Sequence, residues 1–335
     1  MRNKYTLKAI ATLLVLICST ANAQFSATTV KKIITSDDGY PLISYRLKMV
    51  PDMYKGKPSK ALIIYIHGST CESVLSKMDF LAGPLLFGAS VVVLERRGID
   101  ENRKADEATC NEFSGKETRV EDHLRIIREY SAKLPKETPV ILIGGSEGAD
   151  VAATVAAREP RVTELVLIGG GGAWTQAEEF QHFLTAKGSL LGLSKKEELD
   201  KIFDDIKANP DSLKMWAGHS YRRWSSYLWD RPSDYLVKLD IPIFVAQGDK
   251  DDSVPVGSAR ALSKLFSDLG KTNLTYKEYK NANHSFINVT NGVRMTPLME
   301  TDILQWLRDL HILSDTETET FIQRVKKAHP ECFAQ

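Results

Sequence analysis

Short continuous apolar runs recur along the central part of the chain, and each ends at or close to a glycine. They are ALIIYIHG (61–68), ASVVVLERRG (89–98), PVILIGGS (139–146), TELVLIGGGG (163–172) and IPIFVAQGD (241–249). Runs of this kind are typical of strands that are buried on both faces of a parallel sheet. LTYKEYK (274–280) is a further strand candidate.

Helix-like segments separate these runs. They are RVEDHLRIIREYSAKL (119–134), EGADVAATVAAREP (147–160), SARALSKLFSDLG (258–270) and TPLMETDILQWLRDL (296–310). The alternation predicts an α/β fold with a mostly parallel, twisted sheet flanked by helices. Ahead of it, TTVKKIITS and PLISYRLKMV flank the turn residues 37–39 and predict a hairpin.

Residues 173–232 interrupt the alternation. This stretch holds no buried-strand run, but it holds helical segments and four of the five tryptophans: Trp174, Trp216, Trp224 and Trp229. We therefore predict a helical cap at 173–232, inserted into a core made of residues 24–172 and 233–335. Its aromatic side chains either roof an apolar pocket or build the cap's own core, and the sequence leaves both interpretations open.

The first 23 residues have the pattern of an export signal. MRNKYTLK is basic, AIATLLVLICST is apolar but too short to span a bilayer, and A-N-A at 21–23 is a small-residue cleavage signal. We expect a mature chain that starts near Gln24 and is periplasmic or secreted. Lipidation at Cys18 is disfavoured, because Ile17 stands where a small residue is required. No later segment has 18 consecutive apolar residues, which predicts a mature chain without a membrane span.

Composition and cysteine content change the picture little. The formal charge is +1 and no basic run carries interleaved aromatics, so no nucleic-acid partner is indicated; oligomeric state is not indicated either. Export permits a disulfide. Cys71 and Cys110 each lie in a loop after a predicted strand and are the favoured pair; the alternative is that both, with Cys332, are free thiols. None has metal-ligand spacing.

Ser146 stands in the pattern Gly144-x-Ser146-x-Gly148, between a predicted buried strand and a predicted helix. This is the context of a nucleophile elbow, a sharp turn that needs small neighbours and exposes the serine. A serine hydroxyl is a poor nucleophile without a positioned base. The motif therefore calls for a histidine at another strand end.

His284 in KNANHSF is the best candidate for that base, because it follows the last predicted strand in a loop of small and polar residues. The acid that orients the base is expected after the preceding strand, where QGDKDDSVP offers Asp249, Asp251 and Asp252. Chemistry alone leaves this choice open. The order serine, aspartate, histidine is the one that the elbow motif expects.

On these motifs, together with His67-Gly68 and Glu95-Arg96-Arg97-Gly98, the chain resembles the α/β-hydrolase superfamily. It is most similar to capped, exported members grouped with serine aminopeptidase-like and dienelactone-hydrolase-like enzymes. The resemblance implies Asp251 as the acid, three residues after Gly248 and four before Pro255. It also implies an oxyanion hole made by the backbone N–H groups of Glu147 and of Ser69, or less favourably Thr70.

The implied activity is acyl transfer through a covalent serine ester, without a metal or organic cofactor. We expect a small-molecule carboxylic ester, thioester or small amide as substrate. A peptidase is the alternative within the class, and a non-catalytic binding protein on the same scaffold is the alternative from another class. Candidates for the substrate pocket are His67, Thr70, Trp174 and Trp224.

Two further residues or pairs near the predicted site could affect its chemistry: Glu147, and the cysteines Cys71 and Cys110. The Glu147 carboxylate either faces the amine end of a substrate or is favoured at a helix N-terminus for its charge. A bridge between Cys71 and Cys110 would tie the oxyanion loop to the loop after Gly98 and preorganise a backbone donor beside Ser146.

Overall fold

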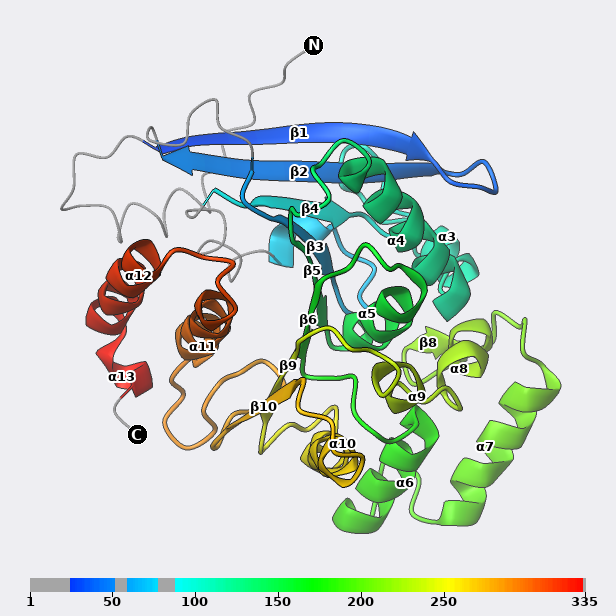
Figure 1. Cartoon of the computed structure of the whole chain (residues 1–335). Helices are drawn as coiled ribbons and strands as arrows, with labels where there is room; N and C mark the ends of the chain where they lie inside the picture. The colour runs from blue at the N-terminus through cyan, green and yellow to red at the C-terminus, as the bar shows by residue number, and fades with distance from the viewer. Residues whose placement is uncertain (1–24, 52–58, 78–87, 334–335) are drawn as a thin grey trace.

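The computed structural model describes residues 25–51, 59–77 and 88–333, so the expected export signal lies outside the described residues. An eight-stranded sheet runs through the centre in the order β1-β2-β4-β3-β5-β6-β9-β10 (Figure 1). The strands are β1 (Phe25–Thr35), β2 (Pro41–Pro51), β3 (Leu62–Ile66), β4 (Ser90–Leu94), β5 (Val140–Gly145), β6 (Glu164–Ile168), β9 (Ile243–Gly248) and β10 (Leu274–Tyr279).

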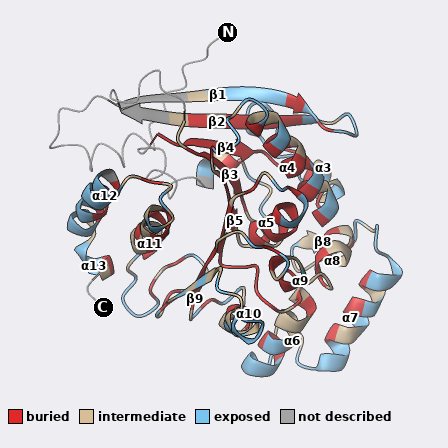
Figure 2. Ribbon diagram, viewed as in Figure 1, coloured by how far each residue is buried: buried red, intermediate tan, exposed pale blue. Residues whose placement is uncertain are grey.

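The strand directions agree with those expected from the hydrophobic pattern, an antiparallel hairpin followed by a parallel sheet. β1 and β2 form the predicted antiparallel hairpin, and β2 also pairs antiparallel with β4. From β4 to β10 every neighbouring pair is parallel. All residues of β3, β4 and β6 are buried, which is why their sequences are continuously apolar (Figure 2). The predicted α/β class with a mostly parallel sheet is confirmed.

Helices cover both faces of the sheet (Figure 1). One face packs against α4 (Lys116–Ser131), α5 (Glu147–Arg158) and α10 (Val256–Asp268), and the other against α11 (Thr296–Asp309) and α12 (Asp315–Ala328). Shorter elements are η2 (Val74–Lys77), α3 (Glu107–Glu112), α9 (Ser233–Leu236) and α13 (Pro330–Phe333). Across the described ranges, no helix has the length and apolar character needed to cross a bilayer.

The segment predicted as a cap folds into α6 (Gln176–Lys187), α7 (Lys196–Ala208), the small pair β7 (Met215–Trp216) and β8 (His219–Ser220), and α8 (Tyr221–Tyr227). It has a hydrophobic cluster of its own, separate from the two clusters of the sheet. Trp224 lies in that cluster, 5% exposed, and its indole N–H donates to the carbonyl of Trp216 at 2.7 Å. The boundaries at residues 173 and 232 stay a prediction.

Candidate active site

Three side chains meet at the carboxyl ends of β5, β9 and β10. Ser146 directly follows β5, Asp251 comes three residues after the last residue of β9, and His284 follows β10. His284 Nε2 lies 3.0 Å from Ser146 Oγ, and His284 Nδ1 lies 2.8 Å from Asp251 Oδ2 and 3.0 Å from Oδ1. The structure thus brings together the serine, histidine and aspartate that the sequence singled out.

Ser146 occupies a strained backbone conformation. Its φ of 54° and ψ of −127° are values that non-glycine residues rarely adopt, and α5 starts at the next residue. Close packing holds the turn: a Cβ added to Gly148 would lie 2.1 Å from the carbonyl oxygen of Ile66 in β3. The Ser146 N–H also donates to the carbonyl of Ile168 at 2.8 Å. The small residues around the serine therefore permit the approach of helix and strand that fixes the hydroxyl.

The Asp251 carboxylate is anchored on three further sides. Its Oδ1 accepts from the backbone N–H groups of Ser253 (2.9 Å) and Val254 (2.8 Å), and its Oδ2 accepts from Gln247 Nε2 (2.8 Å). The Asp251 side chain is fully buried. Gln247 was not recognised in the sequence, although a polar residue inside the apolar run IPIFVAQG was a signal for it. This side chain orients the acid that in turn contacts His284.

The histidines near the site differ in their electrostatics. Burial opposes protonation of His284, but its hydrogen bond to Asp251 and the charges of Asp251 and Asp252 outweigh burial and raise its pKa above 6.5. In contrast, burial and the neighbouring Arg119 and Arg96 hold the pKa of His67 well below its ordinary value. The same causes lower the pKa of His123 to about 3. Of these three histidines, His284 is the one whose pKa is raised by its surroundings.

The other sequence candidates are dispersed. Thr70 is exposed, and Trp174 is half-buried, with its ring tilted against that of His182 at a centroid distance of 5.1 Å. His67 is 2% exposed and lines a small cavity of about 10 Å³ with Arg96, Arg119 and His123. A role of these residues in a substrate pocket stays a prediction, as it does for Trp224 in the cap cluster.

The predicted oxyanion loop runs directly beside the serine. A Cβ added to Gly68 would lie 3.3 Å from Ser146 Cβ and 3.7 Å from its Oγ. Glu147 is the first residue of α5, so its N–H is among those that a helix leaves without an intrahelical acceptor. Within the described parts of the chain, no group of three or more His, Cys, Asp or Glu is placed to hold a metal ion.

Glu147 stands in the first turn of α5, where a negative charge is favoured, and its carboxylate faces protein groups instead of a substrate amine. It is 2% exposed and is paired with Arg96, Arg119 and Arg223. Burial by itself would raise the pKa of this carboxyl, but the charges of Arg223, Arg119 and Arg96 outweigh it and hold the pKa well below its usual range. The carboxylate is therefore ionised and inaccessible to a substrate amine in this structure.

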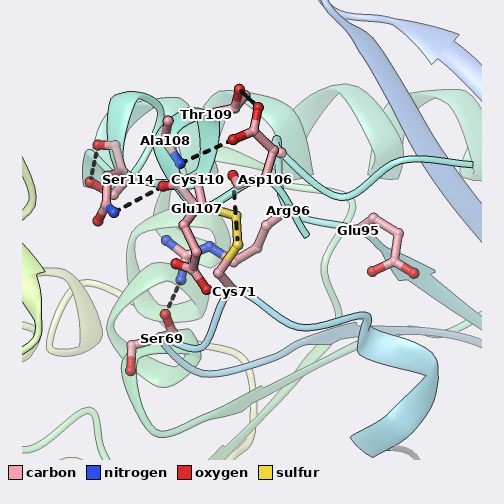
Figure 3. The surroundings of a disulfide bond; sticks show 12 residues. Ser69, Cys71, Glu95, Arg96, Asp106, Glu107, Ala108, Thr109, Cys110 and Ser114 are labelled. Carbon is pink, nitrogen blue, oxygen red and sulfur yellow. Dashed lines mark hydrogen bonds between the residues drawn. A yellow bond between two sulfur atoms is a disulfide. The ribbon is translucent and has the colours of Figure 1, made fainter. Parts of the chain in front are cut away.

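Cys71 and Cys110 are joined by a disulfide with a Cα–Cα distance of 6.1 Å, as predicted (Figure 3). Cys71 follows Ser69 in the oxyanion loop, and Cys110 lies in α3. The guanidinium of Arg96 lies beside the bridge and donates to the Ser69 carbonyl at 2.7 Å (Figure 3). Cys332 is a buried free thiol. The bridge ties the loop after β3, which is the predicted oxyanion loop, covalently to α3.

We expect a Cys71→Ser/Cys110→Ser double variant to lower the free energy of unfolding by about 4 kcal/mol, the loss that chain-entropy theory gives for a bridge across 39 residues. Urea denaturation of both proteins measures it. As a check on the bridge, the denatured chain starting at Gln24 should titrate one thiol without reductant and three with it. Three thiols in both conditions would contradict the pairing.

The fold and the site define an α/β hydrolase. The profile of the family described as "Serine aminopeptidase, S33" matches residues 57–290, more than half of the chain, so the chain belongs to this family of α/β hydrolases. It is accordingly an enzyme of the serine hydrolase class.

Individual relatives are more distant. A stretch of 74 residues is 35% identical to Esterase LipQ of Mycobacterium tuberculosis, and it spans 22% of this chain and 18% of that protein. A thermostable carboxyl esterase from Bacillus coagulans is similar in structure, with a TM-score of 0.59 and 17% identity over 84% of this chain and 98% of its own.

Two further solved structures share the fold. Est1E from Butyrivibrio proteoclasticus, with ferulic acid bound, has a TM-score of 0.52 and 20% identity over 91% of this chain and 100% of its own. The acylaminoacyl peptidase of Pyrococcus horikoshii has a TM-score of 0.57 and 15% identity over 88% of this chain and 43% of its own.

Proposed function

We propose that this protein is an exported serine hydrolase that cleaves a carboxylic ester, with thioesters and small amides as related substrates. Ser146 is the nucleophile, His284 the general base and acid, and Asp251 the carboxylate that orients the imidazole. The observation that carries the proposal is the continuous hydrogen-bonded path from Ser146 Oγ through both ring nitrogens of His284 to Asp251.

The reaction proceeds in two acyl transfers. His284 Nε2 takes the proton of Ser146 as its Oγ attacks the substrate carbonyl, and the N–H groups of Glu147 and Ser69 stabilise the oxyanion. The imidazolium then protonates the leaving alcohol, and the acyl-enzyme forms. Water, deprotonated by His284, attacks this ester, and the acid leaves with Ser146 regaining its proton. Asp251 stabilises the charged imidazolium in both halves.

We place an ester before a peptide as the substrate because of the environment of Glu147. An aminopeptidase must recognise a free amine, and the acidic residue beside the nucleophile, Glu147, is enclosed by three arginines. The carboxyl esterase from Bacillus coagulans has the same fold, but so does the acylaminoacyl peptidase, so the fold does not decide the question. Peptidase activity remains the second candidate.

Labelling with a fluorophosphonate probe tests the proposal. We expect the label on Ser146 by mass mapping, and hydrolysis of p-nitrophenyl esters in preference to aminoacyl-naphthylamides. Folded protein that takes up no label would support the binding-protein alternative, and a label on another residue would contradict Ser146 as the nucleophile. Preference for the aminoacyl amides would favour the peptidase.

The pH dependence of activity follows from the histidine. A protonated His284 cannot accept the proton of Ser146, so kcat/KM should fall on the acid side with a midpoint above 6.5, because the pKa is raised. Asp252 contributes to that rise by its charge. Asp252→Asn should therefore lower the midpoint at low ionic strength, and 1 M salt should reduce the difference between variant and wild type. An unchanged midpoint at low salt would contradict this role.

Export is part of the proposal because of the N-terminal pattern and the disulfide. Expression of the full chain in a bacterial host, followed by N-terminal sequencing of the protein from the periplasm or medium, should give a chain that starts at Gln24. Retention of Met1 in the cytoplasm would contradict it.

A further inference from the structure

The carboxylate of Glu147 is enclosed by guanidinium groups from three separate segments of the chain. Its Oε1 accepts from Arg119 Nη1 at 2.5 Å and lies 3.4 Å from Arg96 Nη1, and its Oε2 accepts from Arg223 Nε at 2.7 Å. Arg96 follows β4, Arg119 belongs to α4 and Arg223 to α8. The three arginine side chains are 5–6% exposed.

Two of these arginines also hold the loop after β3. Arg96 Nη1 donates to the carbonyl of Ser69 at 2.7 Å, and Arg119 Nη2 donates to the carbonyl of His67 at 2.6 Å. Between these two carbonyls lies Gly68, the residue that packs against Ser146. The carboxylate of Glu147 is therefore connected, through one guanidinium on each side of Gly68, to the loop that carries the proposed second oxyanion donor.

Sheet hydrogen bonds do not reach the two donors. The register between β3 and β5 ends at the pair Ile66 and Gly144, whereas the proposed donors are the N–H groups of Ser69 and Glu147. The distance between those N–H groups thus depends on contacts beyond the sheet. The arginine-bridged carboxylate is such a contact, since Glu147 supplies one donor itself and is linked to Ser69 through Arg96.

We propose that Glu147 is a positioning residue: its ionised side chain, through Arg96 and Arg119, fixes the separation of the two oxyanion donors. This inference rests on the proposed function of the site and deepens it. The effect acts on transition-state stabilisation, because the donors must match the oxyanion more closely than they match the ground-state carbonyl.

The negative charge of Glu147 holds the three arginine side chains together. Without it, three buried guanidinium groups would face one another with no anion between them, and an uncompensated buried charge is strongly unfavourable. The arginines would then separate or admit water, and Arg96 would move the carbonyl of Ser69 with it. A neutral side chain of the same shape keeps the volume but not the attraction.

The cap takes part in the same arrangement. Arg223 lies in α8, and its neighbour Arg222 donates from Nη1 to the carbonyl of Glu112 in α3 at 2.9 Å. The helix α3 also carries Cys110. A closed series of links therefore surrounds the proposed oxyanion loop, and it consists of the disulfide, α3, α8, Glu147 and Arg96. Displacement of α8 would remove one of the three arginines from Glu147, so the proposed positioning also depends on α8.

Glu147→Gln tests the inference, with Asp122→Asn as the matched control. Asp122 is also a buried carboxylate paired with an arginine, and it accepts from Arg97 Nε at 3.0 Å and Nη2 at 2.7 Å instead of from the arginines that hold the loop after β3. For Glu147→Gln we expect kcat on a p-nitrophenyl ester to fall about 100-fold with KM within about threefold, the pattern of a lost transition-state interaction. Affinity for a trifluoromethyl ketone, which forms a tetrahedral adduct, should fall in parallel.

The control separates positioning from plain structural support. Asp122→Asn should lower Tm while leaving kcat and ketone affinity within about threefold of wild type. Equal losses of kcat in both variants, or full ketone affinity in Glu147→Gln, would overturn the inference while the wild-type enzyme still hydrolyses the ester and takes up the fluorophosphonate. A wild-type protein that does neither would instead overturn the proposed function, and this inference with it.

A second variant serves if Glu147→Gln does not fold. Arg96→Lys keeps the charge, but Arg96 Nη1 contacts both Ser69 and Glu147, and the ammonium of the shorter lysine side chain does not reach the position of that nitrogen. We expect kcat to fall about 10-fold with little change in KM. A kcat equal to that of wild type would show that Arg96 does not link Ser69 to Glu147 in a way that affects catalysis.

Discussion

Replacing Ser146 with alanine is expected to lower kcat for ester hydrolysis by about 10⁴- to 10⁶-fold, because no acyl-enzyme can form without the hydroxyl. The remaining rate would come from substrate binding and from the backbone N–H groups beside the site. Burst kinetics with a p-nitrophenyl ester and active-site titration measure the loss. The variant should fold normally, since alanine occupies the same backbone position without new atoms.

Ser285→Ala is the matched control for this experiment. Ser285 is exposed and directly follows His284, so its substitution alters the same loop without touching the proposed nucleophile. Its kcat should stay within about threefold of wild type. A Ser146→Ala protein that keeps more than a tenth of the rate would show that another group performs the attack.

Asp251→Asn is expected to lower kcat by about 10⁴-fold through the tautomer of His284. Asp251 Oδ1 accepts two backbone N–H groups, so the oxygen of an asparagine would take that position. Its NH₂ group would then stand at Oδ2, which lies 2.8 Å from His284 Nδ1. Two donors cannot share that contact, so the imidazole must carry its proton on Nε2. In that form it cannot accept the proton of Ser146.

Two neighbouring acids provide the controls. Asp249→Asn and Asp252→Asn should keep kcat within about threefold when each variant is compared on the alkaline plateau of its own pH profile. ¹H NMR of the ring N–H resonances can follow the tautomer directly in the Asp251→Asn protein. Loss of activity in Asp249→Asn equal to that in Asp251→Asn would reverse the choice between the acids.

The sequence carried most of the information on the fold and on the three candidate catalytic side chains. The buried strands are short apolar runs, and the elbow glycines are required by local contacts, so both leave local patterns. The strands nevertheless end earlier than the predicted runs. ERRG at 95–98 and the glycines at 169–172 lie beyond β4 and β6, where Gly98 and Gly169 have positive φ values of 99° and 61°. Such φ values take the chain out of the extended conformation at these two glycines.

The arginine environment of Glu147 could not be predicted in the same way. Arg96, Arg119 and Arg223 are 51, 28 and 76 residues from Glu147 in the chain. No local pattern records contacts across such separations, and a buried carboxylate with three arginines looks in sequence like ordinary surface charge. The same holds for the aromatic residues of the predicted cap. From the sequence alone, Trp224 could roof a substrate pocket or belong to the cap's own core, because its neighbours come from distant parts of the segment.

The disulfide bears on the order in which the active site is assembled during folding. The bridge closes a loop of 39 residues, whereas the contact between Ser146 and His284 closes one of 138. The shorter closure costs about 1 kcal/mol less chain entropy. It also involves only segments that are synthesised before β5. Oxidation can therefore join the loop after β3 to α3 while Ser146 and His284 are still far apart. Once formed, this covalent link keeps the loop with the proposed donor Ser69 attached to α3 through any later opening of the sheet edge that carries His284.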